Sequence, residues 1–303
     1  MRAESFFVFL HQNMEKAKIL IADSGSTKTD WAVVARGADG QLSHEHWQTQ
    51  GLNPVLMSDG DLNGVLHDEL LPQVPGLKEE VREVFFYGAG VRPDMVRRME
   101  QVFAGVFRAG VAHAASDLLG AARALCGHGE GIACILGTGA NSCLFDGEQI
   151  VANTPALGFI LGDEGGGAAL GKRFLNAIFK GLLPARLRDE YLQATGLTLA
   201  DIIRRVYREP MPNRFLASTS TFVAQHVEEE QVRLLVVENF RQFFTHNIVS
   251  YGRRDLPVSF VGSIAHYYEP LLRQAAEAEG FEVGKIVKSP IDALCDYHQD
   301  SWR

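Results

Sequence analysis

Residues 19–34 read Ile-Leu-Ile-Ala-Asp-Ser-Gly-Ser-Thr-Lys-Thr-Asp-Trp-Ala-Val-Val, and Asp39-Gly40 follows. An apolar run, a turn of small polar residues and a second apolar run predict a β-hairpin. Residues 134–145 repeat this design as Cys-Ile-Leu-Gly-Thr-Gly-Ala-Asn-Ser-Cys-Leu-Phe before Asp146-Gly147. Small residues at such turns let backbone N–H groups point toward an anion. The duplicated hairpin therefore predicts two similar halves that hold a nucleotide.

Length and charge narrow the class of protein. A chain of 303 residues can bury a large core and favours two domains. It carries 29 Lys+Arg against 37 Asp+Glu and has no long basic run, so nucleic acid is a poor expectation for its partner. We expect a small-molecule partner, and a homodimer stays open.

The cysteines and the start of the chain indicate where the protein works. Cys126, Cys134, Cys143 and Cys295 contain no Cys-x-x-Cys pair, so we expect reduced residues of a cytoplasmic protein. The apolar residues 6–10 are too few for a signal peptide, and nothing else approaches a membrane span. We expect residues 1–17 to be a leader outside the fold, with Met14 as an alternative initiator.

The order of strands and helices predicts an α/β protein with a domain boundary near residue 115. Apolar runs predict further strands at 81–87, 111–114, 258–261 and 285–288. Helical spacing predicts helices at 58–71, 93–107, 118–125, 168–182, 187–195, 198–207, 219–251, 267–279 and 291–298.

The turn at residues 23–30 is the sharpest local signal for function. Asp23 ends a strand that looks buried, where a carboxylate needs a cation or hydrogen bonds. Lys28 could meet a phosphate, and Asp23 could hold Mg²⁺ through its water shell. An ordinary hairpin turn without a ligand is the alternative.

Three further motifs lie where a helix is expected to begin. Gly162-Asp163-Glu164 and Asp117 place carboxyl groups where a helix begins, which suits either a helix cap or a ligand contact. Residues 261–265 carry a glycine that either turns the chain or lets an adenine ring approach the backbone.

Two other stretches are not assigned a function. Residues 166–173 fit half of a P-loop, but Arg173 stands where Ser or Thr would bind Mg²⁺, so we reject that interpretation. His44 and His46 flank Glu45 in a polar stretch and are expected to be solvated, because no histidine spacing typical of a metal site is present.

Taken in order, the motifs resemble those of the actin-like ATPase and sugar-kinase superfamily. Residues 23–29 look like its first phosphate motif, residues 136–141 its second, and residues 261–265 its adenosine motif. Gly162-Asp163-Glu164-Gly165, after Ala156-Leu157-Gly158, resembles the N-acetylglucosamine kinases grouped with the BadF/BadG/BcrA/BcrD ATPases. The resemblance covers about residue 18 to the end of the chain.

The resemblance implies a fold. It is a two-domain actin-like ATPase fold of the ribonuclease H-like type, with duplicated α/β domains around a nucleotide cleft. Residues 18–115 would form the first domain, 116–290 the second, and the helix at 291–303 would return to the first.

The resemblance also implies site residues. Asp117 would be the base that accepts the proton of the sugar 6-hydroxyl, and Asp23 would serve the metal. Contacts with ATP fall to Ser24, Gly25, Ser26, Thr27, Lys28, Gly137, Thr138, Gly139, Gly262 and Ser263. Contacts with the sugar fall to Asn53, Asn141, Gly158 and Asp163.

The chain also departs from the family pattern. Gly166 stands where a Ser is common, Leu157 replaces an aromatic residue beside the sugar, and Val55 stands where sugar kinases can place Trp. These departures leave the identity of the sugar undecided, above all whether the protein recognises an N-acetyl group.

We therefore predict an ATP- and Mg²⁺-dependent kinase that phosphorylates the 6-hydroxyl of an amino sugar, with N-acetylglucosamine as the first choice. Glucosamine, N-acetylmannosamine and N-acetylmuramic acid are alternatives. An ATPase activator of a 2-hydroxyacyl-CoA dehydratase is a rival, although the chain lacks the closely spaced cysteines that would hold its iron–sulfur cluster. A non-catalytic module that binds ATP or sugar is the other rival.

Overall fold

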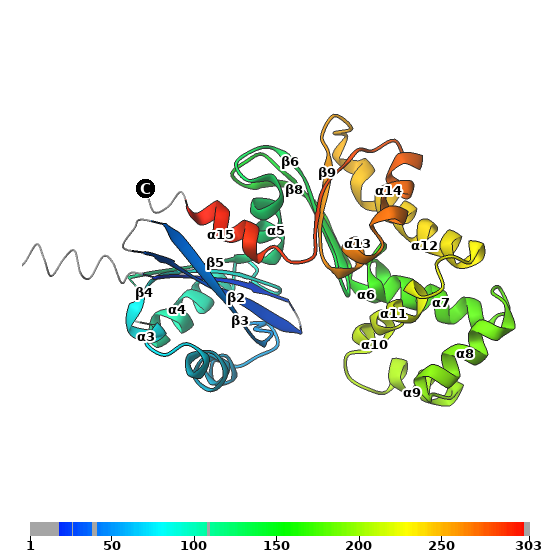
Figure 1. The fold of residues 1–303 in the computed structure, drawn as a ribbon, viewed down its shortest axis with the longest axis horizontal. Coiled ribbons are helices and arrows are strands. Elements are labelled where there is room, and N and C mark those ends of the chain that lie inside the picture. The colour runs from blue at the N-terminus through cyan, green and yellow to red at the C-terminus, as the bar shows by residue number, and fades with distance from the viewer. Residues whose placement is uncertain (1–17, 26, 38–40, 108–109, 300–303) are drawn as a thin grey trace, which may run out of the picture. The chain divides into compact units, whose positions relative to one another are not determined.

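The chain forms two compact units. The computed structural model describes residues 18–25, 27–37, 41–107 and 110–299, so the expected leader, Ser26 and Asp39-Gly40 lie outside the described residues. Unit 1 contains residues 1–127 together with 290–303, and unit 2 contains residues 128–289. Figure 1 shows the ribbon of both units.

Unit 1 is built on one five-stranded sheet with helices on both of its faces (Figure 1). Its strands are β1 (Lys18–Ser24), β2 (Lys28–Arg36), β3 (Leu42–Gln50), β4 (Val81–Gly88) and β5 (Val111–Ser116). Its helices are α2 (Asp59–Gly64), which continues through helical turns at Val65–Leu70 and Leu71–Gln73, then α3 (Leu77–Glu80), α4 (Val96–Val106), α5 (Asp117–Cys126) and α15 (Ile291–Gln299).

Alternating apolar residues of β1 make the two faces of this sheet. Leu20 and Ala22 pack in the core cluster that includes Met99 and Phe103 of α4. Ile19 and Ile21 pack on the opposite face with α15, which contributes Ile291, Leu294 and Cys295. The period of two in a strand thus gives one buried strand two apolar faces, each covered by helices.

Unit 2 repeats the sheet of unit 1. Its strands are β6 (Gly131–Leu136), β7 (Ala140–Phe145), β8 (Ile150–Thr154), β9 (Val258–Val261) and β10 (Val283–Val287). The sheet order is β8-β7-β6-β9-β10, which matches β3-β2-β1-β4-β5 of unit 1. In both sheets the first three strands pair antiparallel and the last two pair parallel. The predicted duplication therefore extends from the hairpins to the whole sheet.

The helices of unit 2 include one long segment that differs from the prediction. They are α6 (Gly158–Leu161), α7 (Gly167–Phe179), α8 (Ala185–Thr195), α9 (Leu199–Tyr207), α10 (Pro212–Ser218), α11 (Ser220–Ala224), α12 (Glu230–Phe243), α13 (Ser263–Tyr267) and α14 (Glu269–Ala278), with helical turns at Phe244–Ile248 and Val249–Tyr251. The single helix expected over 219–251 is wrong, because the chain leaves the helix between Ala224 and Glu230. The break places Glu230 in the first turn of a new helix, where a carboxylate is favourable.

The boundary between the units also differs from the expected residue 115. Residues 116–127 lie in unit 1, because α5 follows β5 directly and packs against the sheet of that unit. Strands β3 and β8 and helices α3, α6, α10 and α13 were not predicted. Most of β3 is exposed, so backbone pairing with β2 rather than an apolar pattern defines it.

Among the described residues, the structure contains no helix with the length and apolar character needed to cross a membrane.

Candidate active site

In unit 1, the predicted metal and catalytic residues lie at the carboxyl ends of the parallel strands β1 and β5, which flank β4. Ser24 of β1 is level with Gly88 of β4, and Gly88 is level with Ser116 of β5. Asp23 is the residue before Ser24, and Asp117 is the residue after Ser116. The register of the sheet therefore gathers both carboxyl groups at one edge, where α/β sheets commonly bind ligands.

The Ser24 hydroxyl joins the hairpin turn to the segment that follows β3. Its buried hydroxyl lies 2.8 Å from the Thr29 hydroxyl, accepts the Leu52 N–H at 2.9 Å and lies 3.1 Å from the Leu52 carbonyl. Gly25 N–H donates to the Lys28 carbonyl at 3.0 Å and closes the hairpin. Gly25, Thr27 and Lys28 are exposed on this turn, while Ser26 lies outside the described residues.

Asp117 is the first residue of α5. Its Oδ1 accepts the Leu118 N–H at 2.8 Å, and the Ser116 hydroxyl caps the helix by accepting the Leu119 N–H at 3.2 Å. Because Ser116 is the helix cap, Asp117 is not needed for that role.

Burial and like charge perturb both carboxyl groups. Burial, followed by the negative charges of Asp117 and Asp30, raises the pKa of Asp23 to about 7, while Lys28 acts in the opposite direction. Burial also raises the pKa of Asp117, against hydrogen bonds that lower it. A pair of carboxyl groups with raised pKa values at a strand edge is typical of a functional site.

Asp30 is a member of this group that the sequence analysis did not select. It is buried, lies opposite Asp23 in the β1–β2 register, accepts from Gln48 at 2.6 Å and pairs with Lys28 at 2.8 Å. Its position two residues after Lys28 on one strand was the available signal, since such residues share a face. The Lys28 side chain remains half exposed at 56%, so it can still meet an anion.

The carboxylates around Asp23 suit a hydrated divalent cation. The negative charges of Asp117 and Asp30 both oppose ionisation of Asp23, whereas the positive charge of Lys28 favours it. A divalent ion would compensate this charge, and Mg²⁺ binds through few carboxylates while it keeps several waters. The residues therefore fit the expected metal at Asp23.

Asn53 is the residue after Leu52, whose backbone N–H donates to the Ser24 hydroxyl. Its Oδ1 accepts the Val55 N–H at 2.9 Å, and its side chain fills the space beside Gly90. A Cβ on Gly90 would lie 2.4 Å from that Oδ1, so Gly90 keeps room for the Asn53 amide. The amide nitrogen of Asn53 is the group that could meet a sugar hydroxyl.

In unit 2, the glycine turn of the second hairpin is packed against the start of α7. Gly137 N–H donates to the Gly139 carbonyl at 3.0 Å, and the carbonyls of Gly137 and Thr138 accept the N–H groups of Gly167 and Ala168 at 2.8 and 2.9 Å. These contacts fix the turn at the N-terminus of α7 and use the first two N–H groups of that helix.

Asp163 is held against this turn. Its Oδ1 accepts the Ala140 N–H at 3.3 Å, and a Cβ on Gly139 would lie 2.7 Å from its Oδ2. Its backbone has a φ of 58°, which is uncommon for a non-glycine residue and is often found at functional sites. Burial raises the pKa of Asp163 against the hydrogen bond from Ala140, and neighbouring Glu164 raises it further.

Glu164 makes a contact that the sequence did not indicate. Its Oε1 lies 3.1 Å from His246 Nδ1. Burial opposes ionisation of Glu164, but the His246 contact and other hydrogen bonds outweigh it and lower its pKa. Sequence spacing gave no signal for this pair, because 82 residues separate its members.

Gly262 is the part of the adenosine motif that the structure brings to the glycine turn. Its φ of 125° and a Cβ position 2.3 Å from the Leu136 carbonyl oxygen leave no room for a side chain. Ser263 is exposed at the start of α13, and Gly158 is exposed at the start of α6.

Asn141 lies on β7, where its Oδ1 accepts from Ser142 N–H at 2.9 Å and from Asn153 Nδ2 at 3.0 Å.

A separate cavity of about 360 Å³ lies among α8 to α11 in unit 2. Tyr191, Arg205 and Phe215 are among its lining residues, and none of the predicted site residues lines it. The motifs rather than this cavity therefore locate the candidate active site.

Comparison with solved structures identifies the class of protein. A "Putative N-acetylglucosamine Kinase" from Porphyromonas gingivalis is 44% identical, with a TM-score of 0.89 over 94% of this chain and 100% of the other. A protein described in the same words from Chromobacterium violaceum is 17% identical, with a TM-score of 0.69 over 93% and 99%. MreB5 of Spiroplasma citri, bound to AMPPNP, is 10% identical, with a TM-score of 0.55 over 95% and 97%.

No protein-family model and no curated protein matches the sequence. The repeated sheet order and the structural neighbours nevertheless define a two-domain actin-like ATPase fold. Within that class, the chain belongs to the N-acetylglucosamine kinase-like family of sugar kinases, in agreement with the motifs.

Proposed function

We propose that the protein is an ATP- and Mg²⁺-dependent kinase that phosphorylates the 6-hydroxyl of an amino sugar, with N-acetylglucosamine as the first candidate. The observation that carries the proposal is the pair of carboxyl groups, Asp23 and Asp117, at the ends of β1 and β5. The 44% identity to the Porphyromonas gingivalis protein supports the sugar class.

The two carboxyl groups would have different tasks. Asp117 would accept the proton of the attacking hydroxyl, since its raised pKa makes it a better proton acceptor than an ordinary carboxylate. Asp23 would hold Mg²⁺, which supplies charge stabilisation to the transferred phosphoryl group.

The residues of unit 2 would bind rather than react. Backbone N–H groups of Thr138 and Gly139 would contact phosphate, while the Gly137 N–H closes the turn, and Gly262 would allow close approach of the adenosine. Asp163 and Asn141 would contact the sugar hydroxyls, as Asn53 would from unit 1. Phosphoryl transfer needs chiefly such positioning and charge stabilisation.

Substitution of the proposed base separates catalysis from binding. We expect Asp117→Asn to lower kcat by at least about a hundredfold, in line with the usual contribution of a general base. ATP affinity, measured by calorimetry, should change less than about threefold, because the Asp117 carboxylate does not contact the nucleotide in the proposed site. Asp68→Asn, an exposed position of unit 1, is the matched control and should retain activity.

The acceptor is tested with a coupled ADP-release assay over a panel of hexoses and N-acetylhexosamines. The highest kcat/KM should be obtained with N-acetylglucosamine. If no sugar stimulates ADP release, the kinase proposal is wrong; if Asp117→Asn keeps its turnover, Asp117 is not the base.

A further inference from the structure

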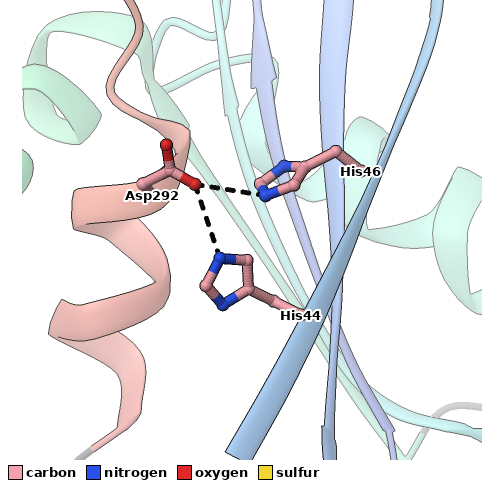
Figure 2. Close-up of side chains that lie close together, drawn as sticks. All are labelled: His44, His46 and Asp292. Atoms are coloured by element: carbon pink, nitrogen blue, oxygen red, sulfur yellow. Dashed lines mark ion pairs between the residues drawn. The ribbon is translucent and has the colours of Figure 1, made fainter.

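A group of side chains that could hold a metal ion lies in unit 1, on the sheet face covered by α15 (Figure 2). His44 and His46 occupy alternate positions of the edge strand β3, on the face to which Leu42 contributes an apolar contact with the α15 cluster. Asp292 lies in the first turn of α15. Figure 2 shows both imidazole rings extending from β3 toward the Asp292 carboxylate.

The distances suit a shared ion. Asp292 Oδ1 lies 3.1 Å from His46 Nε2 and 3.6 Å from His44 Nε2, and the ligand atoms all lie within 4.8 Å of one another. A tetrahedral Zn²⁺ with bonds of about 2.0–2.1 Å holds its ligand atoms roughly 3.3 Å apart. Small rotations of exposed side chains would therefore suffice to form the site.

An ion pair alone is a weak explanation for the arrangement. The side chains of His44, His46 and Asp292 are 38%, 41% and 73% exposed, and ion pairs at such exposure contribute little to stability. The two rings, with centroids 5.0 Å apart and planes at 82°, share one carboxylate oxygen as their partner. A divalent ion would satisfy both imidazoles and the carboxylate together.

We propose that His44, His46 and Asp292 bind Zn²⁺ or a similar divalent transition-metal ion and thereby link α15 to β3. Two imidazole nitrogens and one carboxylate oxygen form a donor set that suits such ions, whereas Mg²⁺ prefers oxygen ligands. Three protein ligands leave a coordination position for water. Because the ligands come together only in the folded unit, the ion would stabilise the fold.

The link would join distant parts of the sequence. His46 lies in the first part of the chain, whereas Asp292 follows after the whole of unit 2, residues 128–289. The ion would therefore hold the returning C-terminal segment on unit 1, independently of the kinase reaction proposed for Asp23 and Asp117.

Calorimetry of the untagged full chain, stripped with chelator and titrated with Zn²⁺ in excess Mg²⁺, tests the site. We expect one Zn²⁺ per chain with a dissociation constant in the micromolar range and a higher thermal midpoint with Zn²⁺. His46→Gln and Asp292→Asn should each weaken binding at least about tenfold, since each removes one of three ligands. Co²⁺ should give the absorption spectrum of nitrogen and oxygen ligation only in the wild type.

Matched controls distinguish this site from general binding to surface side chains. His67→Gln and Asp296→Asn, at other exposed positions of unit 1, should bind Zn²⁺ like the wild type. Equal Zn²⁺ affinity in the wild type and both ligand variants would overturn the proposal, as would a wild type that binds no Zn²⁺ at micromolar concentration. Sugar phosphorylation by Asp292→Asn, assayed without Zn²⁺, should equal that of the wild type.

Discussion

At the residue scale, the surroundings of the Asp23 carboxyl group oppose its ionisation. Partial burial and the charges of Asp117 and Asp30 raise its pKa from 3.8 to about 7. A carboxyl group with a raised pKa in the folded state stabilises the fold at low pH, and that contribution is lost as the pH rises through about 7. A bound cation would reverse this loss, which couples stability to ligand binding.

An NMR titration of labelled aspartate carboxyl groups checks this assignment. In the ligand-free wild type, the signal that disappears in Asp23→Asn should titrate with a midpoint near pH 7. In Asp117→Asn the midpoint should move to lower pH, because a negative charge that disfavours ionised Asp23 is removed. A midpoint near pH 4 in the wild type would contradict the strong perturbation.

Substitution at Asp23 should also change stability in a pH-dependent way. Asp23→Asn removes the group that must ionise above pH 7, so the free energy of unfolding above that pH should be higher than in the ligand-free wild type. At pH 5, wild-type Asp23 is protonated in the folded state, so the free energy of unfolding of the variant should exceed that of the wild type by less. These free energies are measured by urea titration. Addition of Mg²⁺ with nucleotide should raise the free energy of unfolding of the wild type but not of Asp23→Asn.

At the scale of elements, α15 fixes a buried polar group against the sheet of unit 1. His298 stacks on Phe85, with ring centroids 3.7 Å apart, and its Nε2 lies 2.8 Å from the Tyr87 hydroxyl. Arg123 of α5 donates to the same hydroxyl at 2.8 Å, so Tyr87 donates its proton to a neutral His298. Burial, together with the charges of Arg123 and His113, lowers the pKa of His298 to about 3.

This neutral histidine makes unit 1 sensitive to acid. Its folded pKa is depressed below 6.5, so the unfolded chain takes up a proton first, and stability falls as the pH falls from about 6.5 toward 3. The slope from one such group approaches about 1.4 kcal/mol per pH unit. Urea unfolding at several pH values should show a shallower acid dependence in His298→Phe than in the wild type.

The same variant has a second expected effect. At pH 7.5, His298→Phe should lower the free energy of unfolding by about 1 kcal/mol, because the Tyr87 hydroxyl loses its acceptor. His67→Gln, at an exposed histidine, is the control and should keep the wild-type acid dependence. An acid dependence that is the same in all three proteins would contradict the role of His298.

At the scale of the whole molecule, unit 1 is assembled from both ends of the chain. Residues 290–303 return to it after unit 2 is complete, and Ile291, Leu294 and Cys295 bury their side chains against Ile19 and Ile21. Unit 2 is continuous in sequence and has its own core. The two units should therefore depend differently on the C-terminal segment.

Truncation after Ser289 should destabilise unit 1 selectively. Trp31 and Trp47 lie in unit 1, and the third tryptophan, Trp302, is removed by the truncation, so fluorescence follows this unit alone. We expect its urea midpoint to fall, because an apolar face of the sheet loses its cover. Circular dichroism should show a separate transition at higher urea from the helix-rich unit 2.

The control for this prediction is truncation after Gln299, which also removes Trp302 but keeps α15. Its midpoint should match that of the full chain. Coincident transitions at the full-chain midpoint after truncation at Ser289 would mean that α15 does not support unit 1.

The sequence by itself determined the α/β class, both glycine hairpins and the carboxyl groups at strand ends, whereas the return of the last helix was expected only from the family resemblance. These features rest on local turn chemistry and on periodicity, which act between neighbouring residues. It did not determine β3 or the end of unit 1. Strand β3 is held by pairing with β2, and residues 116–127 by packing of α5 on the sheet.

Only the tertiary structure decided which side chains meet. Asp30 faces Asp23 through strand register, Glu164 meets His246, and Asp292 reaches His44 and His46 from the opposite end of the chain. The histidines that the sequence predicted to be solvated are exposed, yet the fold gives them a shared carboxylate partner. Such groupings depend on how sheets and helices pack, because contacts between distant residues leave no local pattern in one sequence.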